Sequence, residues 1–257
     1  MSYAAQLVAL AAGLFLGMLA LLELGRRIGV RRLDRDPEGA RSGVALADGA
    51  VFALLGLLIA FSFSGAAERF QARLMLITDE SNAIGTAWLR LALLPEDVQA
   101  PARESMRRYV DARLDVYRAI PDRERMLEAI ERVSVRQTEL WQIAAAARSG
   151  SEQGWEKLLF LALNEMFDIG TTRTHTMHWH PPNIVFVLLF ALSLGCSWLA
   201  GAAMAGASHR PLGHMLAFAL VVAVTVYIIL DLEFPRQGLI RIDAADQALL
   251  DVRAAMR

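Results

Sequence analysis

The chain has 257 residues, of which 55% are apolar, and its formal net charge at pH 7 is −1. A typical globular protein is about 45–50% apolar, so this composition disfavours a soluble protein. The small net charge and the lack of a basic stripe or a zinc-finger spacing disfavour a nucleic-acid partner. The single cysteine, Cys196, excludes an intrachain disulfide, and we expect it to be a small buried side chain in its apolar run.

Four nearly uncharged stretches are long enough to cross a bilayer, which takes about 20 apolar residues in a helix. We expect transmembrane helices over residues 1–26, 44–67, 183–207 and 212–230. The first stretch lacks the basic start of a signal peptide, and Arg26 and Arg27 lie where a cleavage site would be. It is therefore interpreted as a retained helix.

Residues 68–180 are too polar to cross a membrane and show apolar residues at helical spacing. Four helices are expected in this segment, and the first and last should continue the second and third transmembrane helices. The tail, residues 231–257, ends in a short amphipathic helix with Leu249, Leu250 and Val252 on one side. With no sustained period-two alternation, the predicted fold is an all-α membrane protein with a helical-bundle extramembrane domain between the second and third spans.

Arginine near the ends of the spans predicts the orientation, because short cytoplasmic loops carry an excess of Lys and Arg. The connection over residues 27–43 and the short third loop contain six arginines, Arg27, Arg31, Arg32, Arg35, Arg41 and Arg210. Both loops should therefore face the cytoplasm, with both termini and the large domain on the opposite side. Four arginines that flank spans on that opposite side argue against this orientation: Arg69, Arg73, Arg236 and Arg241.

Three segments together resemble one known family. They are GLLIAFSFSGAAERF over residues 56–70, DESNAIGTAWLRLALLP over 79–95 and DLEFPRQGLI over 231–240. The combination is similar to the bacterial bestrophin-like membrane proteins. Kinship with bestrophins, which are pentameric ion channels, implies a homo-oligomer in a bacterial cytoplasmic membrane. The implied partners are the lipid bilayer, other copies of the chain and inorganic ions, with no cofactor.

The second transmembrane helix is the candidate pore wall. Phe52, Gly56, Ile59 and Phe63 fall on one helical stripe, and Ser62 lies near its outer end. A hydrophobic constriction with a hydroxyl group at its mouth is a known way to gate an ion path. Ordinary helix packing through small residues is the alternative interpretation.

Five carboxylates gather near the expected outer face: Glu68, Asp79, Glu80, Asp231 and Glu233. Repeated in a ring, such carboxylates would attract cations. Asp231 and Glu233 are alternatively expected to pair with arginines that flank the spans, which would make residues 231–235 a structural corner.

A candidate metal site comprises Glu165, Asp168, His175 and His178, which fall roughly along one helical face. Carboxylate and imidazole groups together suit zinc, iron or manganese, but their spacing matches no familiar metal motif. The alternatives are an interfacial belt around Trp179 and a pore mouth whose histidines titrate near neutral pH.

The sequence contains no phosphate-binding loop and no nucleophile motif, so an enzyme is not expected. The leading hypothesis is a homo-oligomeric ion channel with a pore lined by the second transmembrane helix. The alternative is a non-conducting membrane scaffold or sensor whose helical extramembrane domain binds a partner or a ligand.

Overall fold

The computed structural model of the chain describes residues 3–35, 44–147, 154–177, 179–207 and 209–257. Within these ranges the chain is helical and has no strand, which confirms the all-α fold class. Four helices are long and apolar enough to cross a membrane. They are α1 (Tyr3–Arg35), α2 (Val44–Arg90), α6 (Asn183–Ala203) and α7 (Leu212–Glu233).

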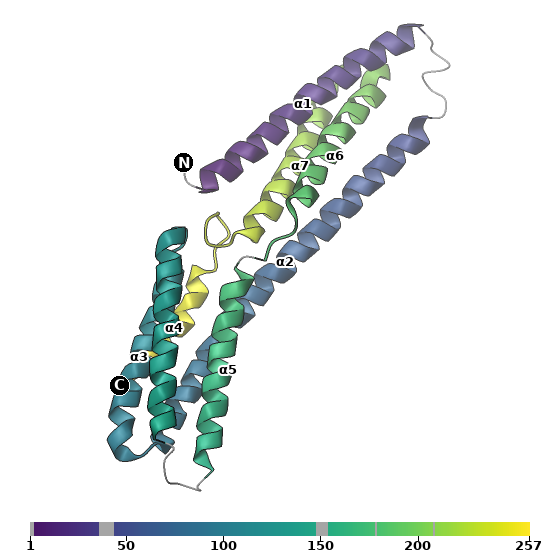
Figure 1. The fold of residues 1–257 in the computed structure, drawn as a ribbon. Helices are drawn as coiled ribbons and strands as arrows, with labels where there is room; N and C mark the ends of the chain where they lie inside the picture. The colour runs from purple at the N-terminus through teal and green to yellow at the C-terminus, as the bar shows by residue number, and fades with distance from the viewer. Residues whose placement is uncertain (1–2, 36–43, 148–153, 178, 208) are drawn as a thin grey trace. The chain divides into compact units, whose positions relative to one another are not determined.

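The chain divides into two compact units, Met1–Phe70 with His180–Ile240 and Gln71–Trp179 with Arg241–Arg257. In the first unit α1, α6 and α7 lie side by side (Figure 1). Their contacts bury Met18, Leu22 and Leu189 completely. The first part of α2 joins this core, where Phe52 meets Phe218 of α7 edge-on with ring centroids 6.2 Å apart.

Glycines allow α1 and α6 to approach until their backbones touch. A methyl group added at Gly201 of α6 would lie 2.0 Å from the carbonyl oxygen of Leu22. One added at Gly25 of α1 would lie 2.1 Å from the carbonyl oxygen of Trp198. Small residues at such crossings are how membrane helices gain packing contacts where the hydrophobic effect offers little.

The second unit is a helical bundle. It contains the rest of α2, η2 (Leu91–Leu93), α3 (Glu96–Arg118), α4 (Arg123–Ala146), α5 (Trp155–Thr176), η4 (Asp243–Asp246) and α8 (Gln247–Ala255). Its core is closed by large side chains without exposed surface, among them Met106, Tyr109, Leu140 and Met166. The amphipathic pattern of residues 68–180 therefore encodes a conventional apolar core.

The helix boundaries of α1 and α3 differ from expectation. Helix α1 continues to Arg35, so the first arginines of the predicted loop are helical, whereas Arg41 lies outside the described residues. The amphipathic pattern of the sequence predicts a helix from Pro101 to Ile120, but α3 already begins at Glu96. Glu96 and Asp97 lie in its first turn, where acidic residues stabilise a helix N-terminus. Helix α2 does continue past the apolar run, as predicted.

The expectation that the last helix of the domain runs on into the third span was wrong. Helix α5 ends at Thr176, and α6 begins only at Asn183. Pro181 and Pro182 lie between them, and proline has no backbone N–H to donate within a helix. The pair of prolines therefore starts α6 as a separate helix.

Replacing Gly201 by alanine is expected to destabilise the first unit, because the new methyl group overlaps the backbone of α1. Overpacking of this kind costs about 1–3 kcal/mol, which for a chain of this size lowers Tm by roughly 5 °C. Thermal unfolding of the purified chain in detergent measures the effect. Gly195→Ala is the matched control on the same helix, because nothing lies within 4 Å of a methyl group there. Equal Tm values for the two variants would contradict the packing described.

Candidate functional site

Helix α2 has one face that no other part of its unit covers. Leu57, Phe61, Ser64 and Glu68 recur at spacings of three and four residues, and all four side chains are exposed. We call these four residues the outward stripe of α2. Its first half is apolar, with Phe61 68% exposed, and its second half carries a hydroxyl and a carboxylate. Ser64 Oγ donates to Glu68 Oε1 at 3.3 Å.

The candidate pore residues from the sequence lie beside this stripe. Gly56 and Phe63 are exposed, and Phe63 is 45% exposed. Phe52 and Ile59 are partly buried and pack against the core of the first unit. Ser62 is also partly covered, and its Oγ atom is buried. These five residues therefore lie on one helix but on two faces of it: Gly56 and Phe63 are exposed, and the other three are partly buried.

The five candidate carboxylates fall into two groups. Glu68 and Asp79 are exposed, whereas Glu80, Asp231 and Glu233 have no exposed surface. A buried carboxylate is costly unless cations or hydrogen-bond donors surround it, and the structure supplies partners for each of the three.

Asp231 closes the corner that follows α7. Its carboxylate accepts hydrogen bonds from the backbone N–H of Leu239 at 3.0 Å and of Ile240 at 2.9 Å. Gly238 makes this possible, since a methyl group there would lie 1.4 Å from Asp231 Oδ1. The geometry is that of the structural corner considered from the sequence.

Glu233 ends α7 and pairs with Arg69 of α2. Arg69 Nε donates to Oε1 of Glu233 at 2.9 Å, and Nη2 donates to the same oxygen. His180 Nδ1 lies 3.5 Å from Oε2 of Glu233, and the imidazole stacks on Phe234 with centroids 4.3 Å apart. The expected pairing of Glu233 with an arginine that flanks a span is therefore present, and it ties α2 to α7.

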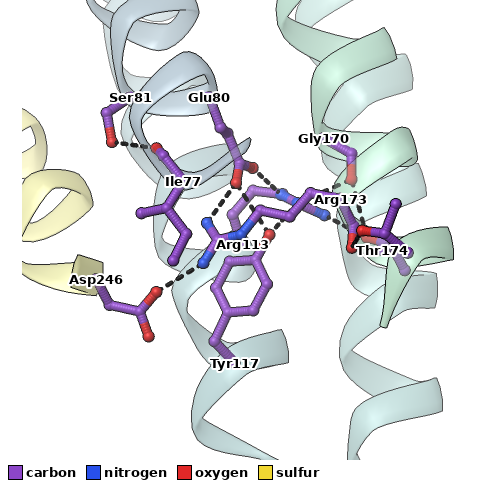
Figure 2. Close-up of polar contacts among 10 residues, drawn as sticks. Ile77, Glu80, Ser81, Arg113, Tyr117, Gly170, Arg173, Thr174 and Asp246 are labelled. Carbon is purple, nitrogen blue, oxygen red and sulfur yellow. Dashed lines mark hydrogen bonds and ion pairs between the residues drawn. The ribbon is translucent and has the colours of Figure 1, made fainter. Parts of the chain in front are cut away.

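Glu80 is the centre of a polar network inside the second unit (Figure 2). Arg113 Nε of α3 donates to Oε1 of Glu80 at 2.5 Å, and Arg173 Nη1 of α5 donates to Oε2 at 2.6 Å. The Tyr117 hydroxyl donates to Oε2 at 2.9 Å. Arg173 Nη2 reaches Asp246 Oδ1 at 2.6 Å, so the network ends in the C-terminal tail.

The remaining donors of Arg113 are also used. Its Nη1 donates to Thr174 Oγ1 at 3.0 Å, and its Nη2 donates to the Gly170 carbonyl at 2.9 Å and to the Tyr117 hydroxyl. The guanidinium of Arg173 lies over the Tyr117 ring, 3.6 Å from its centroid. Each charge in this interior therefore has an opposite charge or a hydrogen-bond partner beside it.

Burial and charge act in opposite directions on the groups of this network. Burial alone would raise the pKa of Glu80, but the charges of Arg113 and Arg173 outweigh it and hold the pKa below its ordinary value. Burial raises the pKa of Tyr117, and the charge of Glu80 adds to that effect, so the phenol stays protonated and donates. Glu80 is consequently a charged structural group that is withdrawn from solvent.

The C-terminal tail belongs to the second unit. Leu249 and Met256 are buried in its core. Arg253 pairs with Asp111 of α3 through two hydrogen bonds of 2.7 and 2.9 Å, and Arg107 Nε donates to the Met256 carbonyl at 3.0 Å. The amphipathic pattern of the tail was predicted from sequence, but its partner, helix α3, was not.

The candidate metal residues do not assemble in the described part of the chain. Glu165, Asp168 and His175 are exposed on α5, and His178 lies outside the described residues. Among the residues that the structure describes, no three His, Cys, Asp or Glu side chains come close enough to hold a metal ion.

Comparison with known proteins identifies the family. The sequence model of the bestrophin-like domain matches residues 12–246. The chain belongs to the bestrophin-like family. Together with its four apolar helices, this membership makes it a membrane protein. A search of curated proteins found no significant match.

Two solved structures share the bestrophin-like fold of this chain. Both are crystal structures of a bacterial bestrophin homologue from Klebsiella pneumoniae, each with one substitution. One has a TM-score of 0.65 at 14% identity, over 93% of this chain and 97% of the other. The second has a TM-score of 0.63 at 15% identity, over 92% and 98%. The resemblance inferred from three sequence segments is confirmed.

Replacing Glu80 by glutamine is expected to destabilise the second unit of this bestrophin-like chain. The change leaves two buried guanidinium groups with too little negative charge, and breaking a buried ion pair costs about 3–5 kcal/mol. The matched control is Asp79→Asn, which changes an exposed carboxylate next door and should shift stability by less than about 0.5 kcal/mol. Thermal unfolding of the full chain in detergent measures both, and equal Tm values would contradict the assigned network.

The dependence of Tm on pH in the acid range gives a second test of Glu80, by comparison of wild type with Glu80→Gln. The folded pKa of Glu80 lies below the ordinary value of 4.5, so its stabilising effect is complete above that pH. The effect is lost as the pH falls through the lower folded pKa. Wild type should therefore lose more Tm below that pH than Glu80→Gln does, and parallel acid profiles would count against the assignment.

Proposed function

We propose that this chain forms a homo-oligomeric ion channel whose path is lined by the outward stripe of α2. The observation that carries the proposal is the low burial of this helix within its own chain. In the most apolar 18-residue stretch of α2, only 11% is buried inside the chain, compared with 50% for the corresponding stretch of α7. A spanning helix with so little protein around it must face lipid or other copies of the chain.

The chemistry of the outward stripe favours other copies over lipid at its polar end. Glu68 is exposed, and an exposed carboxylate next to a membrane span is costly in lipid but stable beside water. Arranged around an axis, several copies of Leu57 and Phe61 would form a hydrophobic constriction, and Ser64 with Glu68 would form its mouth. Gly56 and Phe63, exposed on the flanks of the stripe, would complete the wall.

The ring is needed because four helices from one chain leave no room for a central aqueous path. Family membership supports conduction, because members of the bestrophin-like family are ion channels. Glu68 and Asp79 are the candidate carboxylates that remain accessible to ions, so the proposed cargo is a cation. Glu80, Asp231 and Glu233 are occupied by their structural partners.

The membrane proposed is the cytoplasmic membrane of a bacterium, with the second unit outside the cytoplasm. The support is the arginine at the span ends that lie away from the second unit in the sequence. These arginines are on α1 from Arg26 to Arg35 and at Arg210, between α6 and α7. Short loops that are rich in arginine stay on the cytoplasmic side of the membrane.

Single-channel recording in planar bilayers tests conduction. We expect discrete openings from the wild-type chain and, for Phe61→Ala, a unit conductance at least about twofold larger, because a hydrophobic constriction is relieved. Leu220→Ala is the matched control, since Leu220 is 55% exposed on α7 and lies outside the proposed path. In the same recordings Glu68→Gln should lower the preference for cations.

Silent membranes across salts and pH, with the protein shown to be folded and inserted, would contradict the channel and favour the non-conducting scaffold. Openings that Phe61→Ala leaves unchanged would contradict the assigned lining.

Labelling with a membrane-impermeant maleimide tests the orientation in intact spheroplasts. In a Cys196→Ala background, Leu127→Cys on the exposed face of α4 should react, because the second unit faces outward. Arg210→Cys should react only after the membrane is opened. The reverse pattern would place the second unit in the cytoplasm.

A further inference from the structure

A cavity of about 170 Å³ lies in the first unit, between α2, the start of α6 and the end of α7. Six apolar side chains form most of its wall: Leu58, Phe61, Pro181, Val185, Phe186 and Ile229. An engineered apolar cavity of about 150 Å³ accommodates benzene, so this cavity is large enough for a short length of hydrocarbon chain. It opens on the flank of α2 beside the outward stripe.

One polar atom in this wall lacks a partner. Ser62 Oγ is buried and makes no hydrogen bond to any residue that the structure describes. In the spans, the hydroxyl groups of Ser193, Ser197 and Thr225 donate to the carbonyl four residues earlier. The Tyr227 hydroxyl of α7, like Ser62 Oγ, is buried without a partner among the described residues. A buried hydroxyl without a partner is unusual in native proteins, and at a cavity wall an acceptor from outside the chain would satisfy it.

A second donor faces the same cavity. Arg69 uses Nε and Nη2 for Glu233, whereas Nη1 makes no hydrogen bond to a described residue. Its side chain remains 34% exposed. Gly65 gives the guanidinium its position, since a methyl group at Gly65 would lie 3.1 Å from Nη1. Arg69 thus lies folded back over Gly65, toward Ser62.

The two donors are about one helical turn apart along α2. Ser62 and Gly65 are separated by three residues, which is about 5 Å of helix rise. The cavity also lies where the apolar spans end, because Glu68 is the first charged residue after the apolar run of α2 and Glu233 ends α7. That depth is where lipid headgroups meet the acyl region.

We propose that the cavity binds one diacyl glycerophospholipid per chain. The first carbons of an acyl chain fill the apolar space, an ester carbonyl accepts from Ser62 Oγ, and the phosphate accepts from Arg69 Nη1. A free inorganic anion is disfavoured as the occupant, because the wall is predominantly apolar and such an anion has no hydrocarbon to fill it. This site shares Phe61 with the proposed ion path, but lipid binding to it needs no conduction.

Native mass spectrometry of the purified, delipidated chain, titrated with palmitoyl-oleoyl phosphatidylglycerol in mild detergent, tests the proposal. Val185→Trp should reduce the lipid adduct by at least roughly tenfold, because the indole occupies the cavity. Val187→Trp is the matched control on the same helix, since Val187 is 60% exposed and points away from the cavity lining. Ser62→Ala should weaken binding about fivefold, the usual effect of losing one net hydrogen bond.

One adduct per chain in wild type and Val187→Trp, with its loss in Val185→Trp, would support the site. The same titration with inorganic phosphate should give no adduct. Equal lipid retention in the two tryptophan variants, no adduct in wild type, or phosphate binding that survives Val185→Trp would overturn the proposal. Because binding is measured in detergent, these outcomes are independent of whether the chain conducts ions.

Discussion

The carboxylate of Glu80 has no exposed surface, and a buried charge of this kind is stable only when cations and donors surround it. Arg113 and Arg173 meet it from α3 and α5, and Asp246 balances the second arginine from the tail. Four segments that are distant in the sequence are thereby held by one connected set of charges. The apolar core supplies most of the burial, and this network fixes which helix faces meet.

Helix α2 connects that network to the proposed function. In the second unit it presents Glu80 to the interior, and in the first unit it presents Arg69 to Glu233. Both pairs fix the rotation of the helix about its axis within the unit concerned. With the buried face determined in this way, Leu57, Phe61, Ser64 and Glu68 remain uncovered. Within the first unit, the pair of Arg69 with Glu233 therefore helps to determine which face of α2 is exposed.

The apolar runs, the all-helical domain and the family likeness could be predicted from sequence, because span length, periodicity and motif are local properties. The roles of neighbouring carboxylates could not be assigned as easily. Asp79 and Glu80 look alike as a pair, yet only Glu80 shares a helical face with Ile77 and Ile84. Helical phase was the signal that would have separated the buried carboxylate from the exposed one.

Other features depend on contacts between segments that no local pattern encodes. The burial of Ser62 Oγ depends on the packing of α2 against its neighbours, and the docking of the tail depends on the ion pair of Arg253 with Asp111 of α3. The break between α5 and α6, by contrast, is encoded locally by Pro181 and Pro182, which lie between two segments of helical pattern.

The central claim, that the outward stripe of α2 lines a water-filled path between copies, is tested most directly by cysteine accessibility. Single cysteines are placed along α2 in a Cys196→Ala background, and a charged thiol reagent is applied during current recording. We predict that Leu57→Cys, Phe61→Cys and Ser64→Cys react and change the current, while Leu55→Cys and Ile59→Cys stay protected. Reaction at the two covered positions, or at none of the five, would contradict it.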